Sequence, residues 1–100
     1  MFASIRRYEG DVTLADRLVE HEEEVRSLIG GVAGFHAYYL VRGEDSVASV
    51  TICDDRAGTQ ESNRLAAEWL RDNLAGMKIS PPTITMGDVV IHGVAARTTA

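Results

Sequence analysis

Two histidines and the single cysteine are the residues of this sequence whose types most directly suggest chemistry. They are His36, Cys53 and His92. Imidazole and thiolate groups bind first-row metals, and imidazole is also the commonest general base near neutral pH. His36 and His92 fall in segments that we expect at opposite edges of one sheet, so the sequence does not predict a shared metal. We therefore expect no metal and no cofactor, and we take His36 and His92 as candidate catalytic bases.

A second group of residues is typical of a pocket for a small ligand, because it combines a cation, phenols, a hydroxyl and a thiol on otherwise apolar strands. An arginine removed from water requires an anionic partner. Asp88 is the candidate partner within the chain, and a bound ligand is the alternative. The predicted ligand-contacting residues are Arg6, Tyr8, Tyr38, Thr51 and Cys53.

The composition is typical of one compact domain. The chain has 100 residues, 45% of them hydrophobic, and a formal net charge of −5 with no basic stripe. This charge argues against a nucleic-acid partner, because phosphate backbones would be repelled. No window approaches the roughly 20 apolar residues of a membrane span, and a lone cysteine cannot form an intrachain disulfide. We expect a cytoplasmic protein with a single domain over residues 1–93 and a flexible tail over 94–100.

Hydrophobic periodicity predicts the elements that position these residues. The alternation typical of strands is found at 2–8, 34–42, 47–53 and 83–93. Helical spacing is found over 12–29, and again between Asp55 and Gly76. The order is therefore βαββαβ. Right-handed crossovers fold such a chain into an α+β, ferredoxin-like domain: a four-stranded antiparallel sheet with two helices on one face.

The alternation within each strand also predicts which side chains share a face. The most apolar set should meet the helices, namely Ala3, Ile5, Phe35, Ala37, Tyr39, Val41, Ala48, Val50, Ile52, Val89 and Ile91. A hairpin turning at 43–46 pairs Arg42 with Val47, and so places Tyr38 opposite Thr51 and His36 opposite Cys53. The other face is too apolar to remain in water and too polar for a dry core. We expect it to pack against the same face of a second copy.

Three segments carry a resemblance to a known group of proteins. They are "GFHAYYLV" at 34–41, "VTICDDRAG" at 50–58 and "SNRLAAEWLRDNL" at 62–74. With the order of elements over residues 2–93, they resemble the dimeric α/β-barrel superfamily, which includes antibiotic-biosynthesis-monooxygenase-like and stress-responsive barrel proteins. The resemblance implies the fold and a homodimer. In the monooxygenase branch an acidic residue and then a Trp follow the third strand; here Asp54 matches the acid and Arg56 stands in the place of the Trp.

These observations lead to one functional hypothesis and one alternative. We expect a homodimer that binds a small, partly apolar organic ligand in a lumen between the two sheets, where it would support cofactor-independent monooxygenase-like or isomerase-like chemistry. His36 or His92 would be the base, and Tyr38 or Arg6 would orient the ligand. The sequence leaves open whether the protein is an enzyme. The alternative is a non-catalytic dimerisation or interaction module with no ligand.

Overall fold

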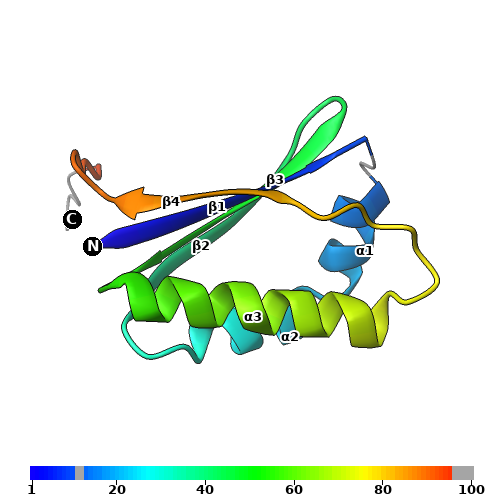
Figure 1. The fold of residues 1–100 in the computed structure, drawn as a ribbon, viewed down its shortest axis with the longest axis horizontal. Helices are drawn as coiled ribbons and strands as arrows, with labels where there is room; N and C mark the ends of the chain where they lie inside the picture. Colours follow the sequence, from blue (N-terminus) through cyan, green and yellow to red (C-terminus); the bar gives the residue numbers. More distant parts are fainter. Residues whose placement is uncertain (11–12, 96–100) are drawn as a thin grey trace, which may run out of the picture.

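The fold is ferredoxin-like, as the order of elements predicts. The computed structural model describes residues 1–10 and 13–95. Its elements are β1 (Phe2–Glu9), α1 (Thr13–Glu20), α2 (Glu22–Gly30), β2 (Phe35–Arg42), β3 (Ser46–Cys53), α3 (Arg56–Asn73) and β4 (Thr83–Asp88). The strands form one antiparallel sheet in the order β2-β3-β1-β4. The three helices cover one face of this sheet, and the opposite face is bare (Figure 1).

The first helical segment is two helices rather than the single helix expected over 12–29. The break falls at His21, whose backbone (φ −112°, ψ 29°) leaves the helical region. Glu22, Glu23 and Glu24 follow directly and occupy the first turn of α2. Acidic side chains are favourable at a helix N-terminus, because the unpaired N–H groups there carry partial positive charge. Three consecutive glutamates therefore favour a new helix start at this position.

Helix α3 lies very close to the sheet at its first turn. Asp55 caps it, accepting a hydrogen bond from the Gly58 N–H at 3.1 Å. A Cβ atom on Gly58 would lie 2.9 Å from the Cβ of Cys53 and 3.0 Å from the Ala33 carbonyl oxygen. The absence of a side chain at Gly58 thus sets the distance between α3 and β3.

The last strand is shorter than the expected 83–93. Pairing with β1 ends where Asp88 meets Phe2, and the Val89 N–H then bonds to the Met1 carbonyl at 3.0 Å. Beyond this point Ile91 is 90% exposed, so it does not face the helices as predicted. His92 is exposed and lies outside the sheet, so its expected place on an edge strand is also wrong. The predicted tail falls partly on residues 96–100, which lie outside the described residues.

The hairpin register is largely as predicted. Arg42 pairs with Val47 and Tyr38 with Thr51. The exception is His36: the ladder goes from Phe35 opposite Cys53 directly to Ala37 opposite Ile52, which leaves His36 as the extra residue of a β-bulge. The predicted pairing of His36 with Cys53 is therefore wrong by one residue.

The two faces of the sheet are the reverse of those predicted, except at Phe35, which stands opposite the buried Cys53 and lies beside Gly30 of α2 as a result of the bulge. The side chains buried beneath the helices are Phe2, Ser4, Arg6 and Tyr8 of β1 and Val47, Ser49, Thr51 and Cys53 of β3. The bare side, which we call the open face, carries Ala3, Ile5, Ala37, Tyr39, Val41, Ala48, Val50 and Ile52. Large helix side chains such as Leu18, Val25 and Trp69 supply much of the volume of the core, so the buried side chains of β3 in this close-packed layer are small. The residues predicted to line a lumen between two sheets therefore lie beneath the helices of one chain.

Candidate functional site

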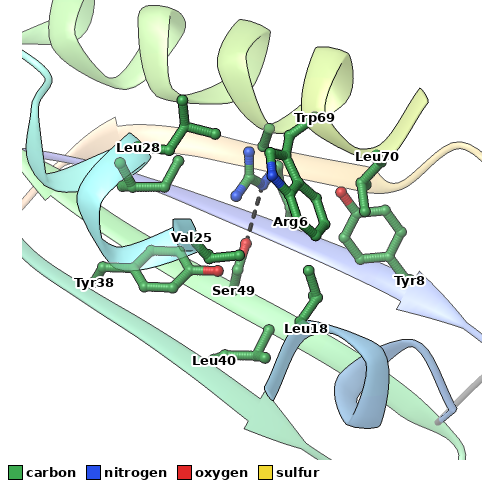
Figure 2. Close-up of a pocket in the computed structure, with 12 residues that line it drawn as sticks. Arg6, Tyr8, Leu18, Val25, Leu28, Tyr38, Leu40, Ser49, Trp69 and Leu70 are labelled. Atoms are coloured by element: carbon green, nitrogen blue, oxygen red, sulfur yellow. Dashed lines mark hydrogen bonds between the residues drawn. The ribbon is translucent and has the colours of Figure 1, made fainter. Parts of the chain in front are cut away.

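A cavity lies between the sheet and the helices, in the middle of this buried layer. We call it the inner cavity; its volume is about 30 Å³, which is room for about two water molecules. The helices contribute apolar side chains, and the sheet contributes the polar ones (Figure 2). Its lining residues are Arg6, Tyr8, Leu18, Val25, Leu28, Ile29, Tyr38, Leu40, Ser49, Ala66, Trp69 and Leu70.

Arg6 is the central polar group of the inner cavity. It lies on β1 next to Ser49 of β3, because these two residues are cross-strand partners. Its Nε donates to the Ser49 Oγ at 3.0 Å (Figure 2), and its guanidinium also donates to the Ser62 carbonyl at 3.3 Å. The side chain is only 4% exposed, and within the described chain no carboxylate forms an ion pair with it. Asp88, the ion-pair partner considered from the sequence, stands opposite Phe2 in the pairing of β4 with β1, at the far end of β1 from Arg6.

Two phenols flank Arg6. Burial raises the pKa of Tyr8, and the nearby Arg6 charge partly lowers it again. Burial also raises the pKa of Tyr38, against a lowering by the charge of Arg6 and by a hydrogen bond with it. Both phenols are therefore protonated at neutral pH, and each is able to donate a hydrogen bond but not to act as a base.

The roof of the inner cavity is held by Trp69 of α3. Its indole N–H donates to the Glu24 carboxylate at 2.8 Å, which joins α3 to α2. The His21 ring packs edge-on against the indole, with the ring centroids 5.2 Å apart. The break between α1 and α2 is thus tied to α3 directly above the cavity.

Two larger grooves adjoin the inner cavity. The outer cleft, of about 490 Å³, lies between α3, the connection over residues 74–82 and β4, and it shares Arg6, Tyr8 and Leu70 with the inner cavity. The edge groove, of about 500 Å³, lies between α2 and β2 and shares Leu18, Val25, Tyr38 and Leu40 with it. The inner cavity therefore lies between two wider grooves and shares lining residues with each.

Three of the predicted ligand-contacting residues line the inner cavity, and the other predicted site residues do not. Arg6, Tyr8 and Tyr38 point into it (Figure 2). Thr51 and Cys53 are buried on the same face of the sheet but are absent from its lining. Burial and the neighbouring charges of Asp55 and Asp54 raise the pKa of the Cys53 thiol, which keeps it protonated.

Both predicted catalytic histidines lie away from the inner cavity and the outer cleft. The His36 imidazole is exposed at the bulge and bonds to the Asp54 carboxylate. His92 is exposed beyond β4. Within the described chain, neither cavity has a histidine in its lining. No three His, Cys, Asp or Glu side chains of residues 1–10 and 13–95 come together in a metal-binding group.

Sequence reasoning missed the residues that the helices contribute. The place of Trp69 in the cavity roof was not predicted. The Ser62 carbonyl, a partner of Arg6, lies in a regular turn of α3 and carries no sequence signal. Gly58 did hold a signal: a glycine in the first turn of a helix indicates close approach to the strand that precedes it.

Comparison with known proteins gives no match to a family model and no match to a curated protein. None of the helices in the described part of the chain is long and apolar enough to cross a membrane.

Several solved structures share the fold over nearly the whole chain. A dimeric ferredoxin-like protein from an uncultured marine organism is 14% identical, with a TM-score of 0.71 over 94% of this chain and 98% of that one. A monooxygenase from Streptomyces coelicolor, solved with the ligand nanaomycin D, is 18% identical, with a TM-score of 0.68 over 95% and 92%. A haem-degrading protein from Mycobacterium tuberculosis, with two haems in its active site, is 17% identical, with a TM-score of 0.64 over 94% and 100%. The chain thus has the same ferredoxin-like fold as these solved structures.

Proposed function

We propose that this protein binds a small, partly apolar organic ligand at Arg6, where the inner cavity meets the outer cleft. The observation that carries the proposal is a guanidinium that is 4% exposed and has no carboxylate partner within the described chain. Removing a charge from water costs several kcal/mol unless it is compensated. A ligand oxygen that carries negative charge would supply the missing compensation, and the apolar helix side chains would cover the rest of the ligand.

The proposed chemistry is cofactor-independent oxidation or isomerisation. Arg6 and the protonated Tyr38 are fixed donors in a site with little water, which is the arrangement that stabilises negative charge developing on an oxygen atom. Because His36 and His92 lie away from the site, we do not assign the role of base to them. Haem fits these residues less well, because neither histidine nor cysteine lines the two cavities of the described chain.

We further propose that the protein is a homodimer joined through the open face. Ile5, Tyr39 and Val41 are 40%, 58% and 52% exposed there, and Ile5 is in one cross-strand row with Val50 and Tyr39. A contiguous apolar patch of this kind is rarely left in water by a monomer. A second copy seated on the open face would cover it and leave the Arg6 site of each chain intact. A buried unpaired thiol at Cys53 fits the reducing cytoplasm, which remains the proposed location.

The test of the ligand site is Arg6→Met. If Arg6 serves a ligand, removing its buried charge should raise the free energy of unfolding by about 1 kcal/mol, or about 4–8 °C in melting temperature. The same variant should lose binding. Small aromatic acids, phenols and quinones should raise the melting temperature of the wild-type protein, by mass action, but not that of Arg6→Met.

The alternative, a module with no ligand, predicts the opposite result. Arg6 would then be a structural group that joins β1 to Ser49 and Ser62, and Arg6→Met would lower the melting temperature. No compound would stabilise the wild-type protein. Crystals of protein purified from its native host add an independent measurement, because extra electron density beside Arg6 would show the bound molecule directly.

A further inference from the structure

The outer cleft differs in charge from the rest of the molecule. The chain as a whole has 15 acidic and 10 basic residues. The outer cleft, in contrast, is lined by two arginines, Arg6 and Arg71, and by no carboxylate. A negatively charged protein repels small anions in general, so a local concentration of positive charge decides where an anion can approach.

Other grooves of the described chain lack this character. In the edge groove, Arg26 is paired with Glu22 at 3.3 Å, which leaves no uncompensated cation. The groove beside the first turn of α3 is lined by Asp54, Asp55 and Glu61. Of the two wide openings that adjoin the inner cavity, the outer cleft is therefore the one that attracts anions.

Helix α3 presents adjacent residues to the two compartments. Ala66 lines the inner cavity, while Ala67 lines the outer cleft, and Leu70 is shared by both. Arg71 lies one turn beyond Ala67 on the same side of the helix. Within the described chain, Arg71 pairs only with the adjacent Asp72 carboxylate, at 3.1 Å. Such an exposed pair contributes little to stability, so a ligand anion can replace it.

We propose that the ligand is an amphipathic organic anion that enters and occupies the outer cleft, with Arg71 as a residue that selects for its charge. This inference rests on the proposed function, since Arg6 receives the acidic group at the inner end of the cleft. The ring or chain of the ligand lies against Leu74, Met77, Ile79 and Pro82. The inner cavity, at about 30 Å³, is too small for a ring and does not hold this part of the ligand.

The test compares 2-naphthoate with neutral 2-naphthylmethanol, which has a ring system of the same size, by titration into the full chain. At low ionic strength the wild-type protein should bind the naphthoate about tenfold more tightly. Arg71→Gln should weaken naphthoate binding roughly 3-fold to 10-fold, reduce its salt dependence and leave naphthylmethanol binding unchanged. The matched control is Arg64→Gln, an exposed arginine of α3 that pairs with Glu61 and Glu68 and lies outside the cleft lining.

A second pair of variants identifies the compartment. Ala67→Trp should block the outer cleft and weaken naphthoate binding more than Ala66→Leu, which fills the inner cavity. A larger loss with Ala66→Leu, or equal effects of Arg71→Gln and Arg64→Gln, would overturn the inference. If those overturning results were obtained but Arg6→Met still abolished binding, the proposed ligand site at Arg6 would stand and the assignment of the ligand to the outer cleft would fall. Failure of the wild-type protein to bind either compound would overturn both.

Discussion

At the scale of single residues, the types of the polar side chains predicted which residues gather at the cavity better than the face of the sheet expected for them did. Arg6, Tyr8 and Tyr38 were predicted as ligand contacts because polar groups on apolar strands require partners wherever they point. The three residues line the inner cavity despite the reversal of the sheet faces, and their contact with a ligand stays a prediction. Thr51 and Cys53, predicted on the same grounds, lie outside the lining of the inner cavity. The partners of Arg6 on β3 and α3 required the tertiary arrangement and could not be read from spacing.

The phenol of Tyr38 predicts a stability loss in alkali. Its pKa in the folded protein is raised above the ordinary 10.0, chiefly by burial. As the pH rises past this ordinary value, the unfolded chain loses the proton first, so stability that is fully present below it is lost as the pH approaches the folded-state pKa. The free energy of unfolding in urea should therefore fall above about pH 10, and Tyr38→Phe should reduce the fall.

Tyr8 should contribute to the same loss, because burial also raises its pKa. Tyr39→Phe is the matched control, since this phenol lies on the open face and is 58% exposed. An alkaline transition of equal size in the wild-type protein and in Tyr38→Phe would contradict the assignment.

At the scale of elements, the strand order was predictable, whereas the directions of the strand faces were not. The rule that the more apolar face meets the helices fails here, because Ser49, Thr51 and Cys53 of β3 lie beneath α3 and leave room for its large side chains. The charged residues at the end of β1 did indicate which face of this strand is exposed. Arg7 and Glu9, which form an ion pair at 2.9 Å, alternate with the buried residues and mark the other face.

The contact between α3 and β3 gives a prediction at this scale. Alanine normally stabilises a helix relative to glycine by about 1 kcal/mol. At Gly58 the new methyl group would overlap Cys53 and the Ala33 carbonyl, and overpacking costs about 1–3 kcal/mol. Gly58→Ala should therefore lower the melting temperature. Gly76→Ala, where nothing lies within 4 Å of the added atom, should not. Equal effects of the two variants would show that the close approach is not a constraint.

At the scale of the whole molecule, the sequence and the structure favour a dimer for different reasons. The sequence suggested a mixed polar and apolar face that a second copy would cover. In the structure the uncovered face is instead the apolar one, with the polar set enclosed beneath the helices. The exposed apolar residues that follow β4, Val90 at 88% and Ile91 at 90%, add to the surface that a partner would bury.

The proposed dimer predicts the effect of one charge on the open face. Ile5→Glu should convert the protein to a single copy in sedimentation velocity experiments, because a carboxylate at the centre of an apolar interface would be buried without a partner. Val19→Glu is the control, since Val19 is similarly exposed, at 55%, but belongs to α1 on the helix side. A wild-type protein that sediments as a single copy at high concentration would contradict the dimer.

The bulge at His36 has a consequence for chain length. Phe35 stands opposite Cys53 and Ala37 opposite Ile52, so His36 has no partner residue in β3. Deleting it would leave every other pairing of β2 in place, whereas deleting Tyr38 would turn the preceding residues to the opposite side of the sheet. Within this strand, His36 is therefore the position at which a related sequence could be one residue shorter and keep the same architecture.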